Sequence, residues 1–369
     1  MNKDKYVFAQ MVEFLDNYKF LRIVKKYDGN KYVKHFTCWN QLLTLMFGQL
    51  CNRESLRDLI VALNAHQEKC YHLGVGKHVT RSNLAKANEN RDYRIFEDFA
   101  FHMISEARKK RVNDIFKLNG NVYAFDSTTI DLCLKLFPWA NFSTYKGGIK
   151  IHTLYDVETQ VPAFIHITEA KINDVRAMDV ITYESGSFYV FDRAYNDYHR
   201  LYKIHMMDSF FVVRAKTNIK ARVLKWKRRL PKNILSDCEI ELTGFYTQKS
   251  YPETIRLVRF WDEEDERDRW QVELFFKWLK QHLKIKKFWG TSENAVKIQV
   301  YSAIIAYCLV AIMQHDMKLN RSTYEVLQIL GISLTDKTPL RNLFSKTKFN
   351  DVKEQSGLDG PNLFSNYNF

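Results

Sequence analysis

The sequence predicts an α/β protein in which helical regions flank a central region rich in strands. Apolar residues recur at three- and four-residue steps through 38–63 and 93–107, which is the period of a helix with one buried face. From Gly120 the pattern changes to short runs of alternating apolar residues, as in strands. Beyond about residue 268 the helical pattern returns and continues to about residue 330.

Size and composition indicate a folded protein with a polyanionic partner. At 369 residues the chain exceeds the usual size of one domain. Hydrophobic residues make up 46%, with 26 Phe and 20 Tyr, which excludes a disordered chain. Lys and Arg number 56 against 42 Asp and Glu, and the resulting charge of +14 favours nucleic acid or an anionic membrane face as partner.

Three further features indicate a cytoplasmic protein. The six cysteines are scattered without metal-site spacing, and we expect reduced, mostly buried thiols. The N-terminal segment MNKDKYVFAQ lacks the apolar core of a signal peptide. The longest apolar run, at about 301–313, is too short to span a bilayer and predicts a buried helix. We therefore expect no membrane partner.

The central region follows a recognisable order of elements. Three strands form a predicted meander with a turn at 158–160, and a helix, a strand, a helix and a strand come after it. That order is the one found in the ribonuclease H-like fold. The predicted elements are, in chain order, strands at 121–127, 147–157 and 161–170, a helix at 172–183, a strand at 187–192, a helix at 197–207 and a strand at 209–215.

A basic segment, RVLKWKRRLPK, then interrupts this order and precedes two alternating runs, CEIELTGFY and TIRLVRFW. We interpret it as a β-rich insertion that carries positive charge. The predicted parts are a helical N-terminal domain at 1–118, the first part of the ribonuclease H-like domain at 119–215, the insertion at 216–262, the second part with C-terminal helices at 263–349, and a flexible tail at 350–369.

Within the N-terminal domain, the polar stretch KHVTRSNLAKANENR predicts a short basic helix between helical neighbours. Thr80 or Ser82 could cap this helix, which would carry Lys86 and Arg91. The arrangement resembles a helix-turn-helix reader of DNA, with Arg81 and Lys86 as candidate DNA contacts. A solvated helix on a scaffold bundle fits the pattern equally well.

Two aspartates are candidate metal ligands. Asp126 ends the first predicted strand, and Asp192 ends the fourth. Strands one and four are neighbours in the predicted fold, so the two carboxylates should meet at one edge of the sheet. Carboxylate oxygens suit Mg²⁺ or Mn²⁺, and two such ions can assist phosphoryl transfer. Taken alone, each Asp also fits a loop cap.

The helix DRWQVELFFKWLKQHLK offers Glu273 as a third carboxylate. Arg269, Lys277 and Lys280 share the Glu273 face because they lie four residues before it and four and seven residues after it. The alternative is an ordinary ion pair between Glu273 and Lys277.

Two histidines and one tryptophan are further candidate site residues. His152 and His166 lie on neighbouring predicted strands without a third ligand, so we expect them to be packing residues. Trp226, with Arg228 and Arg229 beside it, could stack on an unpaired base while the cations hold the DNA backbone. The alternative for Trp226 is a hydrophobic anchor in a basic loop.

Three segments carry a resemblance to a known family: YAFDSTTIDLCL, FYVFDRAYNDYHRLY and RDRWQVELFFKWLKQHLKIKKFWGTSENAVKIQ. They resemble the DDE transposases of the insertion sequence 4 family. The segments RESLRDLIVAL and TRSNLAKANENRDYRIFEDF resemble the helical N-terminal domain of its Bacteroides-type members. The resemblance extends from about residue 1 to 345.

The resemblance implies a set of roles. Asp126, Asp192 and Glu273 match the three family carboxylates, which together ligate two divalent ions, Mg²⁺ or Mn²⁺. Arg269 and Lys280 match the Arg and Lys of the signature along the glutamate helix, which contact DNA phosphates. The implied partner is double-stranded DNA, namely the transposon's terminal inverted repeats and the target, bound by a homodimer.

The chain departs from the family pattern just before the glutamate helix. The signature Tyr falls on Glu266, and RLVRFWDEE passes almost directly into DERDRWQVE, so roughly two dozen family residues are missing. The acidic run at 263–266 also lies where DNA phosphates are expected, and like charges repel. We therefore hypothesise a transposase that keeps its three carboxylates and is impaired by a deletion.

The predicted reaction is metal-dependent DNA cleavage at transposon ends followed by strand transfer. Two alternatives remain: a structure-specific nuclease of the same fold, and a catalytically inactive DNA-binding protein derived from a transposase. No nucleotide cofactor is expected, because no GxxxxGK[ST] loop occurs.

Overall fold

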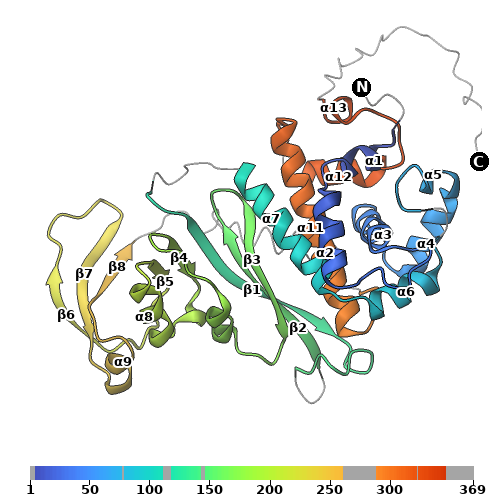
Figure 1. The fold of residues 1–369 in the computed structure, drawn as a ribbon. Coiled ribbons are helices and arrows are strands. Elements are labelled where there is room, and N and C mark those ends of the chain that lie inside the picture. The colour runs from blue at the N-terminus through green and yellow to red at the C-terminus, as the bar shows by residue number, and fades with distance from the viewer. Residues whose placement is uncertain are drawn as a thin grey trace, which may run out of the picture.

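A computed structural model describes residues 5–76, 79–110, 118–142, 146–260, 288–321 and 323–345. Figure 1 shows a helical bundle at one end, a five-stranded sheet in the middle and a three-stranded sheet at the other end. The described part is therefore a mixed α/β structure, as the sequence predicted. The glutamate helix expected near residues 268–284 and the tail expected at 350–369 lie outside the described residues.

The bundle joins helices from both ends of the chain. Thr37 caps one helix through a capping box with Asn40, and Ser55 and Thr80 cap two others. The predicted helical stretch at 38–63 is divided in two, because Asn52 in the intervening turn has a positive φ of 55°. The helices are α1 Val7–Val12, α2 Asn17–Lys26, α3 Cys38–Leu50, α4 Leu56–Ala65, α5 Gln67–Cys70, α6 Arg81–Asn90, α7 Arg94–Lys110, α11 Glu293–Asp316, α12 Thr323–Ser333 and α13 Leu340–Phe344.

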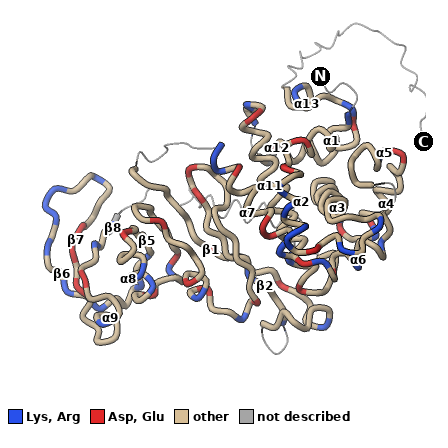
Figure 2. Tube along the Cα trace, viewed as in Figure 1, with Lys and Arg blue, Asp and Glu red and all other residues tan. Residues whose placement is uncertain are grey.

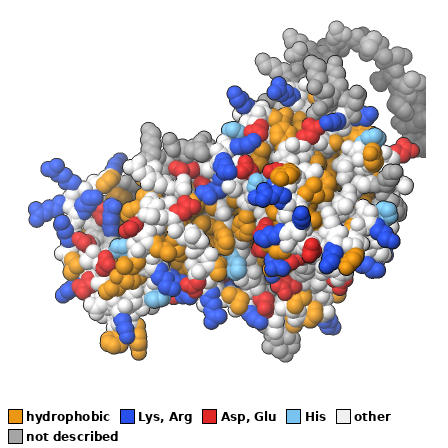
Figure 3. All heavy atoms as spheres, in the orientation of Figure 1, with side chains coloured by type: hydrophobic (Ala, Val, Ile, Leu, Met, Phe, Trp, Pro, Cys, Tyr) orange, Lys and Arg blue, Asp and Glu red, His pale blue; other side chains and the backbone are white. Residues whose placement is uncertain are grey.

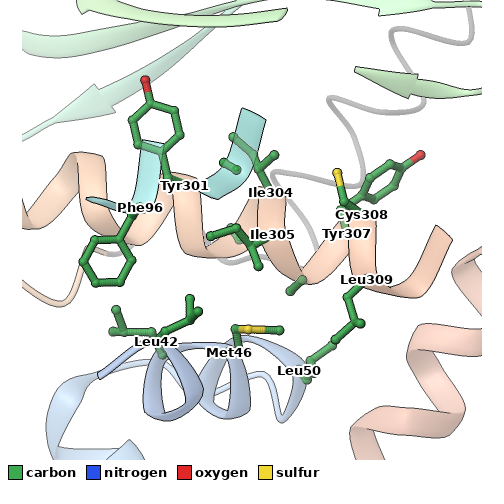
Figure 4. Close-up of a cluster of buried hydrophobic side chains, with 14 of the residues drawn as sticks. Leu42, Met46, Leu50, Phe96, Tyr301, Ile304, Ile305, Tyr307, Cys308 and Leu309 are labelled. Carbon is green, nitrogen blue, oxygen red and sulfur yellow. The ribbon is translucent and has the colours of Figure 1, made fainter. Parts of the chain in front are cut away.

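Helix α11 is the centre of the bundle. It packs against α3 and α7 and reaches strand β3 (Val161–Glu169), so it joins the bundle to the central sheet. Figure 4 shows Ile305 and Leu309 of α11 beside the apolar side chains of α3. This helix is long and apolar enough to cross a membrane, yet 94% of its most apolar window is buried inside the protein. It is a core helix, as predicted, and indicates no membrane span.

The central sheet has the order β3-β2-β1-β4-β5. Its first three strands form the predicted antiparallel meander, and β4 and β5 then add in parallel beside β1. The predicted neighbours, strands one and four, do pair. The strands are β1 Val122–Leu132, β2 Gly147–Asp156, β3 Val161–Glu169, β4 Phe188–Phe191 and β5 Phe210–Val213.

One of the two helices predicted in this region has wrong bounds, and the other is confirmed. The helix expected at 172–183 is a shorter 3₁₀ helix, η1 (Asp174–Val180), which begins where the Asn173 side chain accepts from the Val175 amide. The helix expected at 197–207 is α8 (Tyr198–Met206), capped by Asp197.

The basic segment and the two runs after it form a separate antiparallel sheet of order β6-β7-β8. Its strands are β6 Ala221–Trp226, β7 Ile234–Leu242 and β8 Ile255–Phe260. The sequence had not predicted β6, because its charged side chains mask the strand pattern. The run CEIELTGFY is a strand only as far as Leu242, and Gly244 then caps the short helix α9 (Phe245–Ser250).

Candidate active site and nucleic-acid interface

Asp126 and Asp192 lie at the same level, directly after the last paired residues of the parallel strands β1 and β4. Phe125 on β1 is paired with Phe191 on β4, and each aspartate is the next residue along its strand. Both phenylalanines are 1% exposed, and their rings contact each other at 5.9 Å between centroids. Buried aromatic packing therefore holds the two backbones from which the carboxylates project.

The position predicted for Asp126, at the end of a strand, is wrong. Strand β1 continues to Leu132 because β2 pairs with it from Tyr123 to Leu132. Only β4 stops at Phe191. Asp126 is thus the first residue of β1 that no longer pairs with β4. Among the described residues, the edge of β1 beside it is open, as it would be at the end of a strand.

The amide of Ser127 donates to Asp126 Oδ1 at 2.7 Å. Along β1, the carbonyl of Asn121 accepts from Phe188 of β4, so alternate residues, Ser127 included, turn their backbone groups toward the β4 side. The carboxylate of Asp126 accepts the hydrogen bond of the Ser127 amide at the point where β4 has ended and offers no backbone acceptor. It is held at the edge where Asp192 follows β4.

Tyr195 lies behind this edge, with its ring at 5.1 Å from that of Phe125. Burial raises the pKa of its phenol, and the negative charges of three nearby carboxylates raise it further. Those carboxylates belong to Asp126, Asp174 and Asp192. Asp174 therefore belongs to the same neighbourhood as the two predicted aspartates.

Asp174 was missed by sequence reasoning. Its Oδ1 accepts from Ser127 Oγ at 2.8 Å and lies 3.2 Å from Lys150 Nζ and 3.9 Å from His152 Nδ1. These partners lie 47, 24 and 22 residues away along the chain. No local motif marks such a contact, because only the pairing of β1 with β2 brings Ser127 opposite His152.

His152 and His166 are packing residues, as expected. They are directly paired across β2 and β3, and their rings stack at 6.1 Å. His152 is fully buried, its Nε2 is 2.9 Å from Thr168 Oγ1, and burial lowers its pKa to about 4. It is therefore a neutral imidazole at neutral pH.

The third predicted carboxylate, Glu273, lies outside the described residues, as do Arg269, Lys277 and Lys280. Within the described residues, no group of three His, Cys, Asp or Glu side chains could hold a metal ion. The structure thus places two of the three predicted ligands side by side on neighbouring strands.

The three-stranded sheet presents an exposed basic end. Trp226, at the end of β6, is 60% exposed, and Arg228 and Arg229 follow it in the connection to β7. Figure 2 shows the blue segments gathered at the β6 end, and Figure 3 shows Lys and Arg side chains projecting there. The indole is not buried as a hydrophobic anchor in this structure.

On α6, Arg81 and Lys86 are exposed, and Thr80 caps the helix as predicted. The placement of Arg91 on this helix is wrong, since α6 ends at Asn90. Arg91 turns inward, where it donates to the Thr37 carbonyl and to Gln41 at 2.9 Å. It is a structural tie to α3.

Comparison with known proteins identifies two regions. The family described as "Transposase DDE domain" matches residues 118–309, more than half of the chain. A family described as "Domain of unknown function (DUF4372)" matches residues 3–76.

Three similar proteins are named as transposases. The protein y4zB of Sinorhizobium fredii is 34% identical over 231 residues, covering 56% of this chain and 64% of that protein. A transposase for insertion sequence element IS5377 of Geobacillus stearothermophilus is 29% identical and covers 50% of this chain and 54% of its own length. One for insertion sequence element IS4SA of Synechocystis is 24% identical and covers 78% and 84%. The chain thus spans less than two thirds of the first two relatives.

Among solved structures, a piggyBac transposase synaptic complex with hairpin DNA is similar at 10% identity, covering 92% of this chain and 84% of that chain. Its TM-score of 0.42 is too low to inform the fold. The match to the insertion sequence transposases is consistent with the predicted insertion sequence 4 placement. The chain belongs to the family of transposases with a DDE domain.

Proposed function

We propose that this protein cuts DNA at transposon ends and transfers the cut strand to target DNA. The observation that carries the proposal is the placement of Asp126 and Asp192 directly after the paired residues Phe125 and Phe191 of parallel neighbours. In a chain of the DDE transposase family, two such carboxylates are suited to phosphodiester chemistry.

The strand order β3-β2-β1-β4-β5, with only the first three strands antiparallel, supports a ribonuclease H-like catalytic domain. We interpret the sheet of β6, β7 and β8 as an insertion into that domain, since the family match runs on both sides of it. Residues 1–118 form the helical N-terminal domain of the proposal.

Family membership implies a divalent metal ion. Asp126 and Asp192 supply hard oxygen donors at one sheet edge, and this donor chemistry fits Mg²⁺ or Mn²⁺. We propose two ions held by these residues and Glu273; when bound, they activate the attacking oxygen and neutralise charge on the leaving oxygen.

Other groups of the chain orient the Asp126 carboxylate and shield it from water on one side. The Ser127 amide orients the Asp126 carboxylate, and the aromatic layer of Phe125 and Tyr195 excludes water from behind it. The first step hydrolyses a phosphodiester and frees a 3′-hydroxyl. That hydroxyl then attacks a target phosphodiester, and the target's own 3′-oxygen leaves.

The proposed partner is double-stranded DNA, namely terminal inverted repeats and target. Trp226, Arg228 and Arg229 are exposed together, which supports backbone contacts with the indole available for a base. The remaining proposed contacts, in part from the family resemblance, are Arg81, Lys86, Arg269, Lys277 and Lys280.

We further propose a homodimer in the DNA complex, and a cytoplasmic protein that associates with the nucleoid when bound to DNA. The hypothesis of impairment by a deletion before Arg269 is retained as part of this proposal. Strand transfer at the rate of full-length family members would contradict it.

The testing experiment incubates the full chain with Mg²⁺ and duplexes that carry the inverted repeats flanking its gene. Cut ends and their joining to a plasmid target are measured separately. The proposal predicts both products. Cutting without joining would favour a structure-specific nuclease, and DNA binding without cutting would favour the inactive DNA-binding protein.

A further inference from the structure

We propose that Asp174 is a positioning residue, which acts through Ser127 to fix the Asp126 carboxylate and thereby sets the affinity for the divalent ion. The inference rests on the proposed function, because it assigns the second layer of the same site. It is carried by a continuous set of contacts that runs from Lys150 to Asp126.

The first step of this set is an ion pair beneath the sheet edge. Lys150 Nζ lies 3.2 Å from Asp174 Oδ1 and also donates to the Ile172 carbonyl at 2.9 Å. The Lys150 side chain is only 13% exposed. Because a charge that is largely out of water needs its partner, the ammonium holds the Asp174 carboxylate in one place.

The second step joins Asp174 to β1. Ser127 Oγ donates to Asp174 Oδ1 at 2.8 Å, and this is a bond to a charged acceptor, which is stronger than one between neutral groups. Side chains alternate along a strand, so the Ser127 hydroxyl and the Asp126 side chain leave opposite faces of β1. Asp174 thus reaches the strand from the face opposite Asp126.

The third step passes through the backbone. The Ser127 amide, on the β4 side of the strand, donates to Asp126 Oδ1 at 2.7 Å. The pairing of Ser127 with His152 of β2 holds the other side of the strand, but beyond Phe191 no residue of β4 pairs with β1 to receive that amide. Fixing the Ser127 side chain from below therefore fixes the amide that aims the Asp126 carboxylate toward the Asp192 edge.

A merely structural role is the competing account. The pair of Lys150 and Asp174 could do no more than hold the start of η1 against the sheet. That account predicts that losing the pair lowers thermal stability and leaves metal affinity unchanged. Partners that orient metal ligands typically change metal affinity or activity by about 10–100-fold when removed.

The test measures Mn²⁺ binding to the full chain by calorimetry, together with the Mg²⁺ concentration that gives half-maximal DNA cutting and the melting temperature. Ser127→Ala removes the hydroxyl and keeps the amide. The double variant Asp174→Ala/Lys150→Met removes the ion pair without leaving a buried charge unpaired. The matched control is Asp131→Asn, which changes an exposed carboxylate on the same strand. Ser127→Thr keeps a hydroxyl at position 127 and tests whether the hydroxyl is sufficient.

We expect Ser127→Ala and the double variant each to weaken Mn²⁺ binding by about tenfold and to raise the required Mg²⁺ similarly. The triple variant, which combines Ser127→Ala with Asp174→Ala/Lys150→Met, should bind Mn²⁺ no more weakly than Ser127→Ala or the double variant alone. Both changes interrupt the same set of contacts, so their effects should not add. Ser127→Thr and Asp131→Asn should match the wild type.

Two results overturn the inference while leaving the proposed function intact: wild-type metal affinity in Ser127→Ala, or losses that multiply in the triple variant. A wild-type chain that neither binds Mn²⁺ nor cuts DNA overturns the proposed function itself. Ser127→Ala keeps the ion pair, so a folded protein remains available even if the double variant unfolds.

Discussion

The two sheets of this protein use their side chains in opposite ways. Strand β2 of the five-stranded sheet has nine of ten residues buried, whereas five of the six β6 residues in the three-stranded sheet are exposed. The first sheet is covered by helices and fixes the two aspartates. The second presents charge to the solvent, as the proposed contact with DNA requires. Position and charge are thus supplied by different parts of the chain.

The arginines of the three-stranded sheet fall into two groups, those paired with carboxylates and those without such a partner in the described part of the chain. Arg256 makes two hydrogen bonds to Asp237 at 2.8 and 2.7 Å, and Arg222 pairs with Glu241 at 2.7 Å. In the described part of the chain, Arg228 and Arg229 have no such carboxylate partner. The cations at the end of the sheet are therefore available for phosphate, while those along it hold the strands together.

The largest expected effect concerns the packing behind the two aspartates. Phe125→Ala should lower the free energy of unfolding by about 3–5 kcal/mol, because it leaves a cavity against Phe191 and Tyr195. Urea unfolding measures this. Leu224→Ala on exposed β6 is the matched control and should change it by less than about 0.5 kcal/mol. Equal losses at both sites would contradict the contrast between the sheets.

The second prediction concerns pH. His152 is buried neutral with a pKa of about 4, below its ordinary 6.5, so between these values the unfolded chain binds the extra proton. The free energy of unfolding should therefore fall as the pH drops from 6.5 to about 4, by about 3 kcal/mol from this group.

Unfolding profiles of wild type and His152→Gln isolate this contribution, since His102 and His166 also have lowered pKa values and remain in both proteins. The variant should have the flatter profile over that pH range. Parallel profiles would show that the His152 environment in the folded state does not depress its pKa.

The third prediction concerns the exposed sheet. Arg228→Ala/Arg229→Ala should reduce the magnitude of the slope of log affinity for duplex DNA against log salt concentration by about 2. With two phosphate contacts fewer, DNA binding releases fewer counterions. The melting temperature should not change. Arg222→Ala, whose guanidinium already pairs with Glu241, should change the slope less. An equal change in both variants would argue against the division of charges described above.

Much of the fold could be predicted because its signals are local. Alternating apolar runs predicted the meander, the order of the elements predicted the pairing of strands one and four, and the apolar run at 301–313 predicted a buried helix. Strand β6 was missed because exposed charged residues leave no apolar alternation. The end of β1 was misplaced because its length is set by pairing with β2, and its last residue, Leu132, pairs with Gly147, fifteen residues later.

The candidate site could be predicted only in part from the sequence. Asp126 and Asp192 each follow an apolar run of residues, which is visible in the sequence. Asp174 stands in a polar stretch with no pattern of its own, and its contacts to Ser127 and Lys150 exist only once β1, β2 and η1 have come together. Glu273 stays a prediction, since it lies outside the described residues.

The central claim is that Asp126 and Asp192 perform metal-dependent cutting of DNA. The most direct measurement compares wild type, Asp126→Asn and Asp192→Asn for Mg²⁺-dependent cutting of an inverted-repeat duplex, with DNA binding measured on the same preparations. The account predicts that each variant loses cutting by roughly 10³-fold or more, because several kcal/mol of transition-state stabilisation is lost, while DNA binding is retained. Cutting that persists in either variant would contradict it.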